Sequence, residues 1–210
     1  MKPVRTGIVV VKSGYLLETL SMSCYSLQRE TRIGSSDNAR LQTISRKVLI
    51  EGGDMYNKSI KPSLGYYLAG FADGEGSFNV SFRKKADYEL PWKISLCFNI
   101  SQREKPILAL FKKHLRCGTM RQRKDGVWYF EVNNLNSIIE NVIPFFKRFR
   151  FLSQKKKRDF AKFTRIAELM ANEAAHLSKE GIKQILMIRR DMNDGGKRRY
   201  TEDEIMQELT

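Results

Sequence analysis

The stretch Leu68-Ala69-Gly70-Phe71-Ala72-Asp73-Gly74-Glu75-Gly76 decides the fold, because it joins a helical pattern to an alternating one. Residues 64–72, which run into this stretch, are read as helical without a break up to Asp73, and Ser63 suits the N-cap position. Gly74 and Gly76 admit backbone angles that end a helix. We therefore predict a helix that begins after Ser63 and stops at the acidic turn 73–76.

Small residues recur along one face of this helix. Gly65, Ala69, Ala72 and Gly76 follow one another at spacings of four, three and four positions, which places them on one stripe. Such a stripe lets two helix backbones approach closely. Two arrangements fit this small-residue stripe: an ordinary buried helix in a domain core, or a helix that packs against the same helix of a second chain.

Two runs with a period of two follow the helix. They alternate apolar side chains with polar or basic ones, as expected for an antiparallel sheet covered on one face only. Further along, Asp125-Gly126 marks a hairpin turn. The order is helix, two strands, helix, two strands and then helices, at residues 64–72, 77–83, 92–101, 104–115, 119–124, 127–133, 135–149 and 155–171. This order predicts an α+β fold.

Two segments flank this patterned core of residues 63–171. Residues 1–62 show no sustained period, and we predict a poorly ordered N-terminal extension. Residues 172–210 hold two amphipathic stretches separated by the turn-rich sequence Asn193-Asp194-Gly195-Gly196. We predict a C-terminal helical segment there.

The charge balance indicates a polyanionic partner. The chain has 38 Lys and Arg residues against 23 Asp and Glu residues, a formal net charge of +15 at pH 7. Nucleic acid is the leading candidate, and an anionic membrane surface is the second. We expect no membrane span, because that needs about 20 apolar residues in a row. Residues 7–17 are interrupted by Lys12 and lack a cleavage site, so we expect no signal peptide.

Histidine and cysteine do not group into a site in this sequence. His114 and His176 stand alone, which argues against histidine-metal nucleases and against Ser/His or Cys/His triads. Cys24, Cys97 and Cys117 lie far apart, and they predict reduced thiols in an intracellular protein. Any catalysis would therefore rest on carboxylates.

The nonapeptide at residues 68–76 resembles the LAGLIDADG motif of homing endonucleases, with Phe, Ala, Gly and Glu replacing Leu, Ile, Ala and the last Asp. The element order also resembles the family's αββαββα half-unit, a saddle of antiparallel strands covered on one face by helices. The resemblance extends over residues 63–200, with 177–193 similar to a C-terminal segment of intron-encoded members. It implies a site-specific DNA endonuclease of intron homing, which makes a double-strand break.

The same resemblance implies particular site residues. Glu75 occupies the position of the metal-binding carboxylate, and the Gly74 carbonyl adds a ligand for Mg²⁺ or Mn²⁺. Gln102 matches a polar active-site residue that positions solvent or phosphate. Lys156 matches the active-site lysine, with Lys155 as the alternative because the alignment slips at this point.

A homodimer is also implied, because the chain contains one motif and one copy does not complete two metal sites. Two chains that meet along the small-residue stripe would bring both Glu75 side chains together. We interpret the neighbouring Asp73 as a structural cap or turn residue.

The open face of the sheet is expected to lie in the major groove of double-stranded DNA, with a long, roughly palindromic target. The candidates for reading bases are Asn79, Ser81, Arg83, Lys93, Ser95, Arg121, Arg123 and Tyr129. Basic clusters elsewhere are expected to hold phosphates.

Two other functions stay open. One is an RNA maturase that assists splicing of its host intron, and the other is a non-cleaving DNA-binding regulator on the same scaffold. The basic surface would serve either. The compartment also stays open between a bacterial or archaeal cytoplasm and an organelle, either chloroplast or mitochondrion.

Overall fold

The computed structural model describes residues 60–85, 90–195 and 198–209. The predicted N-terminal extension, residues 1–62, lies outside the described residues except for its last three. The predicted core and the C-terminal helical segment belong to the same compact unit, Val48–Thr210. No helix of the described part is long and apolar enough to cross a membrane.

The element order agrees with the sequence-based expectation. The motif half consists of α3 (Pro62–Glu75), β1 (Gly76–Lys84), β2 (Trp92–Gln102), α4 (Lys105–Leu115), β3 (Thr119–Gln122) and β4 (Trp128–Val132). The remainder consists of α5 (Leu135–Ser137), the π-helical turn η1 (Ile138–Val142), α6 (Ile143–Arg148), α7 (Gln154–Asn172), the 3-10 turn η2 (Ala175–Leu177), α8 (Lys179–Arg189), η3 (Met192–Gly195) and α9 (Glu202–Gln207).

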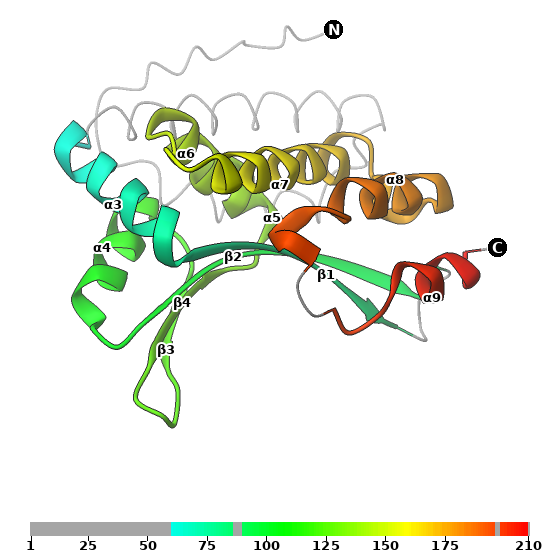
Figure 1. Cartoon of the computed structure of the whole chain (residues 1–210), viewed down its shortest axis with the longest axis horizontal. Helices are drawn as coiled ribbons and strands as arrows, with labels where there is room; N and C mark the ends of the chain where they lie inside the picture. The colour runs from blue at the N-terminus through cyan, green and yellow to red at the C-terminus, as the bar shows by residue number, and fades with distance from the viewer. Residues whose placement is uncertain (1–59, 86–89, 196–197, 210) are drawn as a thin grey trace, which may run out of the picture. The chain divides into compact units, whose positions relative to one another are not determined.

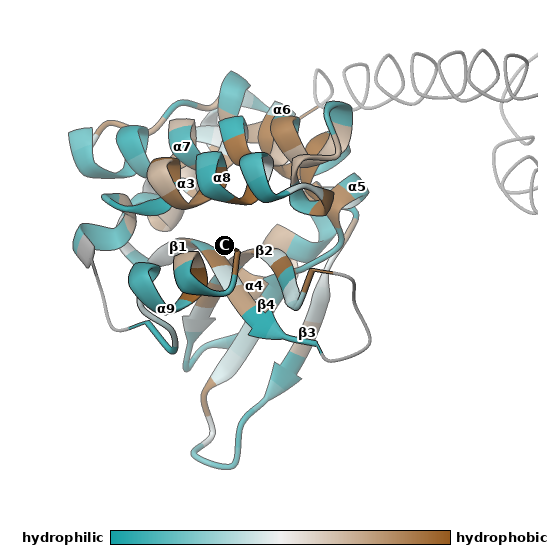
Figure 2. Cartoon of the chain, turned by 90° about the vertical axis from the view of Figure 1, so that its right-hand side faces the viewer, coloured by the Kyte–Doolittle hydropathy of each residue, from teal (hydrophilic) through white to brown (hydrophobic). Residues whose placement is uncertain are grey.

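The four strands form one antiparallel sheet in the order β1-β2-β4-β3. Helices α3, α6 and α7 lie over one face of it, and the hairpin of β3 and β4 extends away from them (Figure 1). In Figure 2 the hydrophobic positions lie mostly in the inner helices and in the strands beneath them, whereas β3 is hydrophilic. The predicted α+β architecture, with helices on one face of an antiparallel sheet, is confirmed.

Phenylalanine rings join the sheet to the helices. The ring of Phe78 in β1 lies 5.1 Å from Phe98 in β2, 5.8 Å from Phe146 in α6 and 5.0 Å from Phe163 in α7, measured between centroids. All four side chains are buried. Because this cluster contains Phe163, in the middle of α7, it fixes the middle of that helix over the beginning of β1.

Two predicted boundaries were wrong. Lys61, not Ser63, is the N-cap of α3, because Pro62 takes the first helical turn, where its missing N–H costs nothing. The helix also continues through the acidic turn to Glu75. The predicted helix 135–149 is divided by a π-helical turn before Pro144, which has no N–H for a regular i−4 bond.

Candidate active site and nucleic-acid interface

The junction between α3 and β1 presents Glu75 to solvent. Glu75 is the last residue of α3, and the amide of Gly76 caps the helix by donating to the Ala72 carbonyl. A Cβ atom at Gly76 would lie 2.7 Å from that same oxygen, so the turn requires glycine. Gly74 and Glu75 are both exposed. Among the described residues Glu75 has no hydrogen-bond or ion-pair partner, so its carboxylate is available to a ligand.

The carboxylate of Asp73, two residues earlier, is hydrogen-bonded within the protein, unlike that of Glu75. Its carboxylate accepts hydrogen bonds from the backbone amides of Leu152 at 3.1 Å and Ser153 at 2.9 Å, and from the Ser153 hydroxyl. Burial alone would raise the pKa of Asp73, but these bonds, together with Lys156, outweigh it and hold the pKa below its usual value. Since Ser153 is the N-cap of α7, Asp73 ties the end of α3 to the start of α7. This geometry agrees with the structural role expected for Asp73.

The start of α7 brings Lys156 to the same junction. Its Nζ donates a hydrogen bond to the carbonyl oxygen of Gly76. Burial lowers the pKa of Lys156, and the nearby carboxylates of Asp73 and Glu75 counteract part of this effect. Lys155 instead points to Asp194, with 2.5 Å between Nζ and Oδ2. The structure therefore brings Lys156, and not Lys155, beside Glu75.

Gln102 lies at the same end of the sheet. It is the last residue of β2, two positions past Ile100, which pairs with Gly76. Its Oε1 accepts a 2.8 Å hydrogen bond from the amide of Arg103, so this side chain is turned onto its own backbone. Glu75, Lys156 and Gln102 thus belong to one end of the sheet.

The predicted base-reading residues share the face of the sheet opposite the helices. In the β1–β2 register Ser81 pairs with Ser95 and Arg83 pairs with Lys93, and Asn79 precedes them on the same side. The alternate residues of both strands are buried against the helices. This uncovered surface of β1 to β4 is called the polar face below.

The β3–β4 hairpin continues the polar face. Arg121 pairs with Tyr129, its guanidinium lies 5.4 Å from the Tyr129 ring, and it forms a 3.4 Å ion pair with Glu131. Burial raises the pKa of the Tyr129 phenol. Arg123 lies just past β3, where it pairs with Asp125 at 3.0 Å.

The sequence-based selection missed several residues of the polar face. The β1–β2 and β2–β4 registers add Ser77, Asn99 and Ser101, and Glu131 is an acidic member that no candidate anticipated. The same two-residue period would have found them, because each lies an even number of positions from a selected residue. Glu131 also shows that the face is not uniformly basic.

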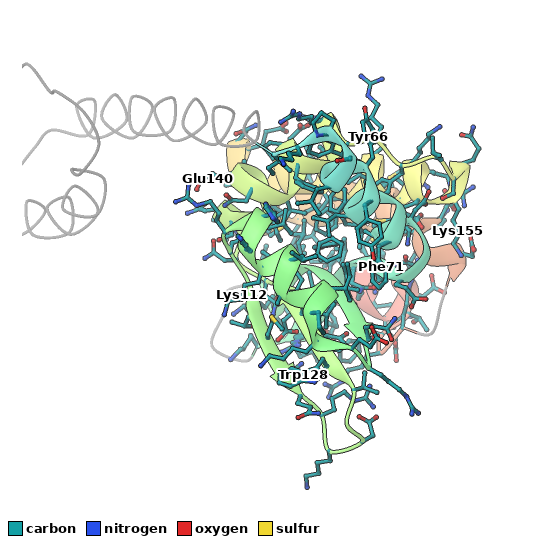
Figure 3. The ribbon with its side chains drawn as sticks, turned by 90° about the vertical axis from the view of Figure 1, so that its left-hand side faces the viewer. Tyr66, Phe71, Lys112, Trp128, Glu140 and Lys155 are labelled. Carbon is teal, nitrogen blue, oxygen red and sulfur yellow. The ribbon has the colours of Figure 1, made fainter. Side chains whose placement is uncertain are left out.

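The expected dimer interface was wrong. The four members of the small-residue stripe are buried in the interior of their own chain. A Cβ atom at Gly65 would lie 2.2 Å from Cζ of Phe149, so this position serves close packing against Phe149. The exposed stripe of α3, seen in Figure 3 on the side marked by Tyr66, consists of Tyr66, Tyr67, Gly70 and Gly74. A partner helix would have to meet this exposed stripe.

Metal ligands are sparse in a single chain. The described residues contain no cluster of three or more His, Cys, Asp or Glu side chains able to hold a metal ion. The exposed Glu75 carboxylate and the neighbouring Gly74 carbonyl are hard oxygen donors. Mg²⁺ commonly takes one or two carboxylates and completes its shell with water and substrate phosphates. The donor set fits such an ion, provided that further oxygens come from a second chain or from DNA.

Residues 68–167 match the family model described as LAGLIDADG endonuclease. This segment, just under half of the chain, is thus similar to the LAGLIDADG endonuclease family. The LAGLIDADG motif is therefore the α3–β1 junction, with Glu75 at its last acidic position, and the matched segment runs through the polar face to the middle of α7.

Proteins similar to this chain include named endonucleases. The chain is 29% identical over 133 residues to a probable intron-encoded endonuclease 2 of Neurospora crassa, covering 61% of this chain and 29% of that protein. It is 28% identical over 128 residues to the DNA endonuclease I-CeuI of Chlamydomonas moewusii, covering 58% and 59% respectively. The crystal structure of the I-LtrWI LAGLIDADG homing endonuclease bound to target DNA is 30% identical, with a TM-score of 0.61, covering 67% of this chain and 46% of that one. The chain thus spans less than two thirds of each of these proteins.

Proposed function

We propose that this protein is a site-specific DNA endonuclease of intron homing. It makes a double-strand break as a homodimer and requires a divalent metal ion. The observation that carries the proposal is the state of Glu75. It is a carboxylate without a partner in the described structure, exposed at the motif position, at one end of the polar face and beside Lys156.

The exposed stripe of α3 supports a homodimer. Gly70 and Gly74 are one helical turn apart, and a Cβ atom added at either would meet nothing within 4 Å. The exposed fractions of Tyr66 and Tyr67 are 58% and 57%, which leaves two large side chains without a packed environment. Glycines beside aromatic side chains allow close backbone approach together with a sizeable apolar contact. A twofold axis along this stripe would place two Glu75 carboxylates near each other.

Mg²⁺ is the metal ion proposed for Glu75 and the Gly74 carbonyl. Bound there, it would neutralise charge on the scissile phosphate and lower the pKa of a water molecule. Lys156 would add positive charge on the protein side, where partial burial strengthens its interaction with a phosphate. Asp73 would keep α7, and with it Lys156, in register with the end of α3.

The polar face is proposed to bind the major groove of double-stranded DNA. A neighbouring fold, I-LtrWI, is described as bound to target DNA, and this chain has the same sheet with basic and amide side chains outward. Amide and guanidinium groups such as those of Asn79 and Arg121 can discriminate bases by paired hydrogen bonds. We expect a long, roughly palindromic target because the homodimer has twofold symmetry.

The deciding experiment is cleavage of a plasmid library of long randomised targets by the purified full chain. Wild type should cut one family of sites in Mg²⁺ and none in Ca²⁺. Glu75→Gln should bind the selected site with unchanged affinity and leave it uncut. Glu180→Gln, which removes an exposed carboxylate from α8, is the matched control and should cut like wild type.

Other outcomes would reject the proposal. Cleavage by Glu75→Gln at the wild-type rate would show that the active site does not lie at the α3–β1 junction. Binding of nucleic acid without any cleavage by a folded wild-type dimer would favour the maturase or the non-cleaving regulator, and intron RNA would then be the next ligand to test.

A further inference from the structure

A cavity of about 340 Å³ lies between β1 and the chain that follows α8. β1 is an edge strand of the sheet. Asn193 in η3 holds the C-terminal chain against it, because its Nδ2 donates to the Phe78 carbonyl at 2.9 Å and to Asn79 Oδ1 at 3.4 Å. The cavity wall includes Asn79 and Ser81, which belong to the polar face. The cavity therefore borders the surface proposed to bind DNA.

Three arginines line this cavity, and one of them has a structural role. Arg198 donates through Nη2 to the carbonyls of Arg189 at 2.9 Å and Arg190 at 2.6 Å, which caps the end of α8. Its Nη1 forms a 3.1 Å ion pair with Glu202, a carboxylate that Arg190 also contacts at 2.9 Å. The charge of Arg198 is thus balanced inside the protein.

The other two arginines, Arg189 and Arg199, form no ion pair with a described residue. Only 7% of Arg189 is exposed, and its guanidinium lies over the Phe82 ring at 4.9 Å. Its Nη1 is fully buried and has no hydrogen-bond partner. Burial lowers the pKa of Arg189 to about 10, with nearby Arg198 acting in the same direction and the Glu202 carboxylate in the opposite one, so the group still carries its charge at neutral pH. Arg199 is exposed, contacts the Tyr200 ring at 5.5 Å and has no ion pair with a described residue.

A buried guanidinium whose nearby carboxylate, Glu202, is already ion-paired with Arg190 and Arg198 is costly, and its presence beside Arg199 indicates that an anion supplies the balance. Guanidinium groups match phosphate oxygens in pairs of hydrogen bonds. Asn79, Asn193 and Ser81 add neutral polar side chains to the same wall. We propose that the cavity binds a phosphate group through Arg189 and Arg199.

The phosphate can come from two sources, the DNA backbone or the free ion. The DNA source rests on the proposed function, because it requires that DNA lie on the polar face next to Asn79 and Ser81. The free-ion source does not. A test with both ligands therefore separates a failure of this site from a failure of the endonuclease proposal.

Inorganic phosphate is the first probe, titrated into the full chain at constant ionic strength with chloride as the reference. The variant is Arg199→Gln, and Arg165→Gln is the matched control, because Arg165 is an exposed arginine of α7 that does not line the cavity. Loss of one charge-assisted contact should weaken phosphate binding by about tenfold or more in Arg199→Gln. Arg165→Gln should bind like wild type. The titration is followed by isothermal calorimetry. Arg189→Met, once circular dichroism shows that it has folded, should give no heat of phosphate binding.

DNA is the second probe, and the salt dependence of its affinity is the readout. Each phosphate contact contributes about 0.9 to the slope of log K against log salt. Arg199→Gln should lower the magnitude of that slope by about this amount relative to Arg165→Gln. A weaker phosphate affinity or a smaller salt slope in Arg199→Gln supports the site. The ligand that shows the change identifies the source of the bound phosphate. Equal behaviour of Arg199→Gln and Arg165→Gln with both ligands would overturn it.

Discussion

A pair of alanine substitutions in α3 tests which side of the motif helix is interior. In Gly65→Ala, the new methyl group would lie 2.2 Å from Cζ of Phe149, more than 1 Å inside the roughly 3.5 Å contact distance of two carbons. The Phe149 ring has no room to withdraw, because it is 1% exposed and its centroid lies 5.0 Å from that of Phe145 and 5.4 Å from that of Tyr66. We therefore take the upper end of the usual overpacking cost, about 3 kcal/mol.

Alanine also improves helix propensity by about 1 kcal/mol over glycine. The expected net effect of Gly65→Ala is a loss of about 2 kcal/mol in the free energy of unfolding, which lowers the melting temperature by about 4–8 °C for a chain of this size. Gly70→Ala is the matched control, because its added Cβ meets nothing within 4 Å. It should gain about 1 kcal/mol.

The assay is guanidinium unfolding followed by circular dichroism at two protein concentrations, because association couples dimer formation to stability. At the lower concentration Gly70→Ala should be the more stable variant, and Gly65→Ala the less stable. If Gly65→Ala were as stable as Gly70→Ala, the small-residue stripe would not be packed against Phe149. The assignment of the exposed stripe as the surface that meets a partner helix would then be wrong as well.

Three further predictions concern the site. Asp73→Ala should lower the free energy of unfolding by about 1 kcal/mol. Because the folded pKa of Asp73 is lowered, its contribution is present above the unfolded pKa and is lost as pH falls through the folded value, so acid titration should bring both proteins to equal stability. Lys156→Gln should reduce single-turnover cleavage by about 100-fold or more, whereas Lys155→Gln should leave it near wild type; equal losses would remove the distinction. Glu131→Gln should raise DNA affinity at low salt, measured by fluorescence anisotropy, because it removes a negative charge and releases Arg121; unchanged affinity would place DNA elsewhere.

Sequence patterns predicted the sheet well for a physical reason. Strand faces alternate every residue, and a sheet covered on one side displays that alternation directly in the sequence. Asn79, Ser81 and Ser95 consequently fell on the polar face as expected. Glu131 was not selected, although it lies two positions beyond Tyr129 in β4 and therefore on the same face.

The motif helix was harder to interpret because both of its sides are suited to packing. One side carries the small-residue stripe, and the opposite side carries Gly70 and Gly74 beside tyrosines. Spacing alone does not say which of two small-residue faces is interior. That choice depends on Phe149, a residue more than seventy positions away whose ring fills the space at Gly65. No local pattern contains this information.

The contacts of Asp73 imply that stability and activity are coupled at this site. Asp73 binds the N-cap of α7, and Lys156 on that helix reaches back to Gly76, so the two helices are joined on either side of Glu75. A change that loosens α7 should therefore displace the Lys156 charge before it unfolds the protein. Asp73→Ala should thus reduce cleavage at temperatures where its folded fraction equals that of wild type, although its carboxylate need not touch the metal or the DNA.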